Sequence, residues 1–378
     1  MLTTGFDHIE SSVESTSQTD RDAVPERISA AERTLAAFGV QVAALLLGLI
    51  AGAGLIGISG ANPIVAYQAV FLGAFGSVFN FLETLVKATP ILLAGLGVAV
   101  AFRCSVWNIG AEGQLKMGAL AATALGIAFV GSGIPGIVTI PLLLLAGFVA
   151  GGAWGAVAGW LKVRMNVNEI ISTIMLNFIA AFFVNYMITG PLRESTGGGV
   201  LLTKEIVETA RLPRFLSDVF LGSRLHLGFF IAIVAAVLVY VFLRHTIPGY
   251  QIRAVGANPD AAQLGGINVS KSIVIALIIS GGLAGIGGMS EVAGLHYRLI
   301  EGFSPNYGAT GIVVALLGRL HPLGVVLASV LFGGLIIGTD AMTRAVEVPG
   351  SIVFVLQGLI ILFALAGEML ARRWRLTT

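Results

Sequence analysis

Long apolar runs are the feature that most constrains this chain. LGFFIAIVAAVLVYVFL (227–243) and IVIALIISGGLAGIGGM (273–289) are two of about ten such stretches, and neither contains a charged residue. Runs of roughly 20 apolar residues match the thickness of the hydrocarbon core of a bilayer. Because lipid offers no hydrogen-bond partners, every backbone N–H and C=O in such a run must bond within the protein, which favours helices. We therefore predict an all-α, polytopic membrane protein.

The composition agrees with lipid as the main solvent. Of the 378 residues, 56% are hydrophobic and 11% are charged, and the mean hydropathy is +0.93, whereas soluble proteins carry roughly 25% charged residues. The net charge of +2 gives no reason to expect a nucleic-acid partner. The single cysteine, Cys104, excludes an internal disulfide.

About ten spans can be placed from the apolar runs. We expect them near residues 35–58, 84–102, 113–130, 139–161, 169–188, 227–243, 273–292, 308–317, 323–338 and 352–370. The eighth is too short to cross a bilayer and is expected to be broken or half-buried. Residues 1–34 are polar, mixed in charge and expected to be a disordered tail; 35–371 form the membrane domain, and 372–378 form a short basic C-terminus.

The positive charges indicate an orientation. With both termini in the cytoplasm, fourteen of the 22 lysines and arginines fall on the inner side and eight on the outer side. This bias follows the positive-inside rule. We expect a multi-pass membrane protein with both termini in the cytoplasm.

Small residues suggest how the spans pack. The fourth span carries glycine every four residues, and the seventh repeats small residues at the same spacing, a pattern typical of closely packed membrane helices. These residues are Gly147, Gly151, Gly155 and Gly159, and then Gly281, Ala284, Gly285 and Gly288.

A short sequence pattern occurs twice. NIGAEG (108–113) and NYGATG (306–311) share N-x-G-A-x-G, and each leads into an apolar segment. In the expected topology the two segments run in opposite directions, as in the inverted repeats that surround transporter substrate sites. Chance similarity is an equal alternative, because glycine and alanine are abundant here.

One polar island, RAVGANPDAAQLGGINVSKS (253–272), interrupts the apolar runs. Asn258 suits a helix N-cap, Pro259 the first helical position and Asp260 the positive helix end. The pair Gly265-Gly266 is expected to end this short helix, with Gly265 in a left-handed turn. The island could dock in a groove of a partner or be an ordinary interfacial loop helix.

The island GANPDAAQLGGINVSKS also resembles the cytoplasmic coupling loop of permease subunits of ATP-binding-cassette importers. FRCSVWNIGAEGQLKMGALAAT (102–123), VNEIISTIMLNFIA (167–180), GGLAGIGGMSEVAG (281–294), GIVVALLGRLHPLGV (311–325) and QGLIILFALA (357–366) extend the likeness. The chain is similar to the family that carries branched-chain amino acids, simple sugars and nucleosides, and is most like the nucleoside and simple-sugar branch. One departure is Leu264, where the family often has an aromatic residue before the paired glycines.

The resemblance implies a location in a bacterial or archaeal plasma (inner) membrane and a set of partners. These are an ATPase subunit that binds ATP and Mg, a second permease subunit (identical or paralogous), an extracytoplasmic substrate-binding protein and membrane lipid. It also assigns contact with the ATPase to Gly256, Asn258, Pro259, Asp260, Ala261, Ala262, Leu264 and Gly265. The chain has no G-x-x-x-x-G-K-[ST] phosphate loop, no metal-ligand spacing among its histidines and no recognisable catalytic arrangement, so we expect a transport subunit without a cofactor of its own, not an enzyme.

Polar residues within or beside spans are candidates for the substrate pathway, because lipid would leave them without partners. Asn177 is the foremost, since an amide both donates and accepts hydrogen bonds, but a contact between helices is an equal interpretation. The full candidate set is Asn108, Glu112, Glu169, Thr173, Asn177, Glu291 and Asn306.

These observations predict the permease subunit of an ATP-driven importer, which carries nucleosides or a related simple sugar by alternating access. A ribose-type or branched-chain amino acid permease is the alternative within the class. An ion-coupled secondary transporter is less favoured, because charge within the spans is scarce.

Overall fold

The computed structural model describes residues 30–194, 201–215 and 222–347, with scattered positions between 355 and 373. The chain divides into two units, Met1–Ala51 with Leu362–Thr378, and Gly52–Ile361. In the first unit, α2 (Ala30–Ile58) begins before the expected residue 35 and continues into the second. Most of the expected N-terminal tail, the tenth span and the basic C-terminus lie outside the described residues.

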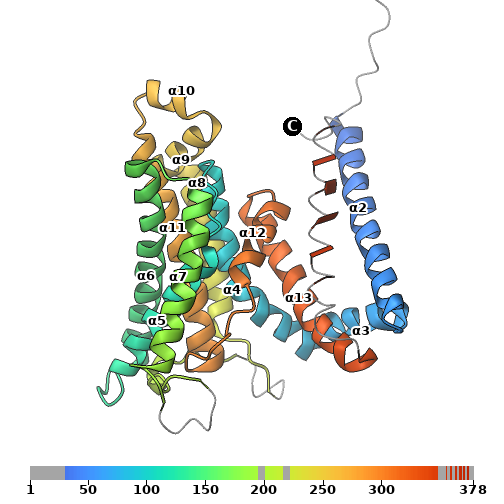
Figure 1. Cartoon of the computed structure of the whole chain (residues 1–378), viewed down its shortest axis with the longest axis horizontal. Helices are drawn as coiled ribbons and strands as arrows, with labels where there is room; N and C mark the ends of the chain where they lie inside the picture. The colour runs from blue at the N-terminus through green and yellow to red at the C-terminus, as the bar shows by residue number, and fades with distance from the viewer. Residues whose placement is uncertain are drawn as a thin grey trace, which may run out of the picture. The chain divides into compact units, whose positions relative to one another are not determined.

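The second unit is built from helices, in agreement with the predicted all-α class (Figure 1). In chain order they are α3 (Pro63–Phe75), α4 (Val78–Arg103), α5 (Ala111–Ala128), α6 (Gly136–Met165), α7 (Glu169–Thr189), η1 (Glu208–Ala210), α8 (Leu227–His245), α9 (Ile247–Ala257), α10 (Pro259–Leu264), α11 (Val269–Ser290), η2 (Glu291–His296), α12 (Tyr307–Leu317) and α13 (Pro322–Val346). In the described part of the chain, β-structure is limited to three isolated bridges.

Within the described ranges, six helices are long and apolar enough to cross a membrane: α4, α6, α7, α8, α11 continued by η2, and α13. Each contains one of the expected spans. The expected third span is α5, a helix of 18 residues whose first turns carry Glu112 and Lys116. The expected eighth span is α12, which has only 11 residues, as its short apolar run predicted. Helix α3 was not expected, although Asn62 and Pro63 form a recognisable helix start.

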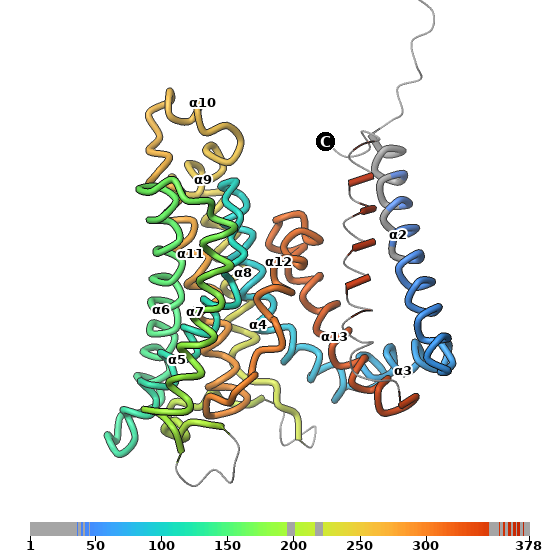
Figure 2. The backbone as a smooth tube through the Cα atoms, viewed as in Figure 1, coloured from blue at the N-terminus to red at the C-terminus, as the bar shows by residue number. Residues whose placement is uncertain are grey.

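The ends of the second unit differ in character. Figure 2 shows α9 and α10 at one end of the bundle, beyond the ends of α6 and α8, and the non-helical segments around η1 at the other. Between these ends lies α4, and 94% of its most apolar stretch of 18 residues is buried by neighbouring parts of the protein. A membrane helix that is buried to this extent faces protein on nearly all sides, so α4 is the centre of the unit.

The predicted glycine stripe packs as expected. A Cβ atom at Gly151 would lie 2.2 Å from the carbonyl oxygen of Gly281, and one at Gly285 would lie 2.1 Å from that of Gly147. Helices α6 and α11 therefore touch backbone to backbone. At so short a separation even a methyl group forces the helices apart.

We predict that Gly285→Ala destabilises the protein by about 1–3 kcal/mol, the usual cost of overpacking, because backbone atoms cannot move aside as a flexible side chain can. The buried Cys104 thiol permits the measurement, since a thiol-reactive dye labels it on unfolding. Gly54→Ala, where an added Cβ meets nothing within 4 Å, is the control and is expected to leave the melting temperature unchanged or higher. Equal melting temperatures for the two variants would contradict the close packing of α6 and α11.

Candidate functional site

The starts of α5 and α12 meet inside the second unit. A Cβ atom at Gly308, in the first turn of α12, would lie 2.2 Å from the backbone nitrogen of Glu112 in the first turn of α5. The two helices then run apart. The end of α12 approaches Arg103 near α9, and the last turn of α5 approaches Val207 at the opposite end of the bundle. The opposite directions predicted for the two N-x-G-A-x-G segments are confirmed.

The carboxylate of Glu112 joins these two helix starts. Its Oε2 accepts a hydrogen bond of 2.8 Å from the backbone N–H of Gly308, and its Oε1 lies 3.3 Å from Nζ of Lys116. The residue is only 7% exposed. Because both helix N-termini carry partial positive charge, one buried carboxylate between them is favourable to both. Glu112 thus has a role in assembling the site.

The two sequence repeats are not equivalent residue by residue. Helix α5 begins at the fourth position of its N-x-G-A-x-G segment, Ala111, whereas α12 begins at the second position, Tyr307. Asn108 is fully buried, but Asn306 is exposed and adopts a left-handed backbone conformation with φ of 61°. The resemblance between the segments therefore extends to position and direction, not to the contacts of the asparagines.

Asn108 holds the approach to α5. Its Nδ2 donates to Oε1 of Gln114 at 2.9 Å and to Oγ of Ser280 at 2.8 Å. Its Oδ1 accepts from the backbone N–H of Gly110 at 3.0 Å and from Nε2 of Gln114 at 3.1 Å. Ser280 lies near the midpoint of α11, so α5 begins deep within the bundle. All the donors and acceptors of this amide are used within the chain.

Asn177 on α7 also bonds to the start of α5. Its Oδ1 accepts from the backbone N–H of Gly113 at 2.7 Å, and its Nδ2 donates to the carbonyl of Ile109 at 2.9 Å. These bonds match the interpretation of Asn177 as a contact between helices. One turn away, the hydroxyl of Thr173 donates to the carbonyl of Glu169, whose carboxylate pairs with Nζ of Lys162 at 2.6 Å.

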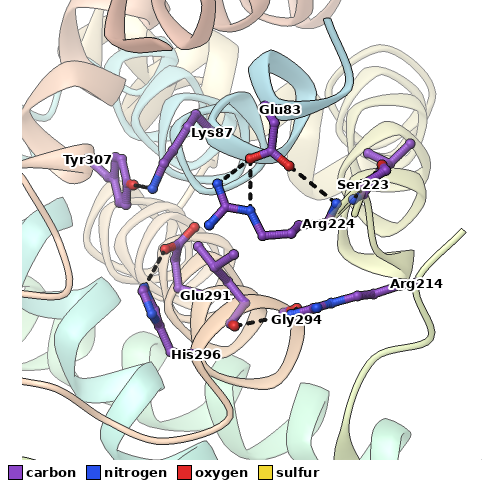
Figure 3. A network of polar contacts seen from close by, with 11 residues as sticks. Glu83, Lys87, Arg214, Ser223, Arg224, Glu291, Gly294, His296 and Tyr307 are labelled. Atoms are coloured by element: carbon purple, nitrogen blue, oxygen red, sulfur yellow. Dashed lines mark hydrogen bonds and ion pairs between the residues drawn. The ribbon is translucent and has the colours of Figure 1, made fainter. Parts of the chain in front are cut away.

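A second polar cluster lies around η2, as Figure 3 shows. Glu83 on α4 is 4% exposed, and it accepts hydrogen bonds from the backbone N–H and the guanidinium of Arg224. Arg224 belongs to the segment before α8, so this pair ties that segment to the central helix. The hydrogen bond to Glu83 raises the pKa of Arg224 above its ordinary value, and the charge of Glu291 adds to this effect.

Glu291 is the one predicted pathway residue whose carboxylate the described part of the chain leaves without a hydrogen bond. It begins the π-helix η2 and is fully buried, and both oxygens lack a hydrogen-bond partner among the described residues. Nε2 of His296 lies 3.5 Å from its Oε2. Close by, Nζ of Lys87 donates to the hydroxyl of the buried Tyr307 at 2.8 Å. π-Helical turns are frequent at functional sites.

Sequence reasoning missed most of this cluster. Glu83 and Arg224 are separated by 141 residues, and Lys87 and Tyr307 by 220, so no local spacing connects them. The sequence signal was the position of Glu291 at the end of the seventh span, which identified this residue but not its surroundings. His226, two residues after Arg224, is buried, and burial lowers its pKa to about 4.

The expected docking helix is present as α10. The side chain of Asn258 caps it by accepting from the N–H of Ala261 at 3.0 Å, and Pro259 occupies the first helical position. The helix end differs from expectation in one detail. Gly265 has φ of −76°, and the left-handed residue is Gly266, with φ of 81°, because the chain turns one residue later. Leu264 is 92% exposed, whereas Ala262 is buried against its own chain.

The neighbouring helix α9 connects α10 to the rest of the site. Gly256 packs directly on the backbone of Arg103 at the end of α4, and its carbonyl accepts a hydrogen bond of 2.7 Å from Oγ of Ser105. Arg103 in turn donates to the carbonyl of Leu320, just beyond α12. The end of α9, just before α10, therefore contacts the segment that leads into α5. It is also linked through Arg103 to the segment that follows α12.

Comparison with known proteins gives a consistent result. The model of a family described as the permease component of branched-chain amino acid transport systems matches residues 80–365. The guanosine ABC transporter permease protein NupP of Bacillus subtilis is 41% identical over 326 residues, which cover 86% of this chain and 92% of that protein. The glucose ABC transporter permease protein TsgB13 of Haloferax volcanii is 34% identical, with 89% of both chains covered. The nucleoside ABC transporter permease protein NupB of Lactococcus lactis is 32% identical, over 86% of this chain and 89% of that protein. No solved structure gives a significant match.

We predict that Arg224→Gln is more destabilising than the double variant Glu83→Gln/Arg224→Gln. Removal of the arginine alone leaves the buried carboxylate of Glu83 without its partner, whereas the double variant leaves two neutral amides. Because the side chain of Arg224 is 44% exposed, we expect a cost below the about 3–5 kcal/mol typical of a fully buried pair. Melting temperatures of the purified protein in detergent, followed by labelling of Cys104, provide the comparison. If the double variant were the less stable of the two, the pair would not be the stabilising contact described here.

Proposed function

Because this chain belongs to the family of permease components of branched-chain amino acid transport systems, and is therefore a membrane transport subunit, we propose that it forms part of the pathway of an ATP-driven nucleoside importer. The observation that carries this proposal is the near full-length similarity to a guanosine permease. A second relative is named as a nucleoside permease and a third as a glucose permease. A simple sugar is therefore the second candidate substrate.

The distribution of charge supports an orientation with α10 in the cytoplasm. Helices α4, α6 and α8 end toward α10, and their last turns carry basic residues. These residues are Arg103, Lys162, Arg164 and Arg244. By the positive-inside rule, we propose that this end lies on the cytoplasmic side of the plasma membrane and that the segments around η1 lie on the outer side.

The family suggests the partners, and this orientation suggests where each would bind. An ATPase subunit that binds ATP and Mg would dock on α10 and its exposed Leu264. An extracytoplasmic binding protein would deliver substrate to the opposite end, and a second permease subunit would complete the pathway. The chain itself has no phosphate-binding loop motif, so the proposed energy source is the ATPase.

The contacts around α9 suggest how ATPase movement reaches the pathway. A displacement of α10 passes to α9, then through Gly256 to Ser105 and the segment that leads into α5. Through Arg103 it also reaches Leu320 at the end of α12. Helices α5 and α12 both start at Glu112, so one displacement of α10 can move both helices. This is the physical connection that alternating access needs.

We expect the permease, reconstituted in proteoliposomes with its ATPase and binding protein, to accumulate radiolabelled guanosine only when ATP is present. Unlabelled glucose and leucine are expected not to compete. Vesicles that contain the permease alone are the control, and a sodium or proton gradient should produce no accumulation in them. Accumulation driven by an ion gradient would refute the proposal, and competition by glucose alone would replace nucleoside by sugar.

A second experiment tests the docking helix. Ala261 is exposed on α10, so Ala261→Trp enlarges the face that would enter the ATPase groove without disturbing the core of the permease. An overfilled groove costs about 1–3 kcal/mol, and we expect loss of ATPase binding or of substrate-stimulated hydrolysis. Ser270→Trp, exposed on α11 and outside α10, is the matched control. Normal binding and normal stimulated hydrolysis in Ala261→Trp would leave α10 an ordinary loop helix.

A further inference from the structure

A cavity of about 290 Å³ lies between α5, α7 and the segment before α12. Its polar lining consists of Lys116 on α5, Asn185 on α7 and Glu301, and its aromatic lining consists of Phe182 and Phe303. Asn185 and Phe182 are near the end of α7 that is remote from α10. In the proposed orientation the cavity is therefore in the outer half of the membrane domain, where substrate arrives.

The size and chemistry of the cavity fit a small polar molecule. Ligand sites usually measure roughly 300–1,000 Å³ and combine apolar walls with a few polar groups. This cavity is at the lower limit, which suits one nucleoside or monosaccharide. The Oδ1 atom of Asn185 is buried without a hydrogen-bond partner among the described residues. Buried acceptors are rarely left without a hydrogen bond, so Oδ1 of Asn185 is available to accept one from a ligand.

The charges of the lining argue for a neutral ligand. Lys116 is already paired with Glu112 at 3.3 Å, and Glu301 adds a second carboxylate to the same region. A phosphate or a free carboxylate would therefore meet no uncompensated cation. Two aromatic side chains favour a flat ring, as a nucleobase provides, because aromatic faces prefer to stack.

We propose that this cavity is a nucleoside-binding site on the transport path, with Lys116 and Asn185 as its hydrogen-bonding residues; the assignment rests on the function proposed above. The donors of the base or ribose bond to the amide of Asn185, and Lys116 donates to an acceptor of the ligand. The bound ligand then shares Lys116 with Glu112. Because the other oxygen of Glu112 holds the first turn of α12, occupancy of the cavity acts directly on the junction of α5 and α12.

Cysteine protection tests the assignment in the complete transporter. Ala181 lines the cavity, and the native Cys104 is buried, so Ala181→Cys is the reactive thiol. Saturating guanosine is expected to slow its reaction with a maleimide about tenfold, because the ligand occupies the space before the thiol. Ser132→Cys, which is exposed in the loop between α5 and α6 and does not line the cavity, is the control and should react at an unchanged rate.

A filled cavity supplies the second measurement. Ala181→Trp is expected to lower ATP-driven guanosine uptake about tenfold, since the indole occupies the site, while Val237→Trp, on the exposed surface of α8, leaves uptake unchanged. The yield of the assembled complex should match that of the unmodified protein, which separates a blocked site from a misfolded one.

The outcomes distinguish this inference from the proposed function. If the unmodified transporter imports guanosine, but Ala181→Trp does so equally well and guanosine gives no protection, the cavity is not the site. If glucose protects and guanosine does not, the site is a sugar site and the nucleoside assignment is wrong. Failure of the unmodified transporter to import guanosine would overturn the proposed function itself, and this assignment with it.

Discussion

The carboxylate of Glu112 is the interaction on which the arrangement of this protein depends. Two helices that begin inside a membrane expose unsatisfied N–H groups where lipid and packed protein offer few acceptors. Glu112 is in the first turn of α5 and accepts from Gly308 in the first turn of α12, so one charge stabilises both starts. The contact is possible because Gly308 has no side chain to separate the helices. Asn108 and Asn177 then fix the backbone that leads into α5, which makes this polar centre rigid on the α5 side.

The same junction can be reached from both ends of the second unit. From the α10 end, Ser105 and Arg103 contact α9 and the end of α12. From the opposite end, Lys116 connects the cavity to Glu112. A short α5 and a shorter α12 serve this purpose better than two full spans would, because a helix that starts within the membrane brings its polar end to the middle of the protein. The lengths of these helices therefore follow from the position of the junction.

The sequence allowed local features to be predicted and left tertiary ones open, for physical reasons. Asn258 and Pro259 determine the start of α10 through contacts within three residues, so the motif was readable. The glycine spacing of α6 also predicted its close packing, since period alone places these residues on one face. By contrast, Asn177 could equally have met substrate or backbone, and only the fold shows its two backbone bonds. The cavity residue Asn185 carries no pattern at all, because its neighbours come from distant segments.

The charges around η2 follow from the same scarcity of partners in a membrane. An isolated buried charge is costly, and Glu83 is compensated by Arg224. Glu291 is buried beside this pair without a hydrogen bond among the described residues, and its charge acts on the same guanidinium. Arg224 is thus an arginine within the influence of two carboxylates, only one of which it contacts. Because Arg224 lies just before α8 and Glu83 lies on the central helix α4, this pair anchors the segment before α8 by charge, whereas α6 and α11 are held together by close contacts between glycines.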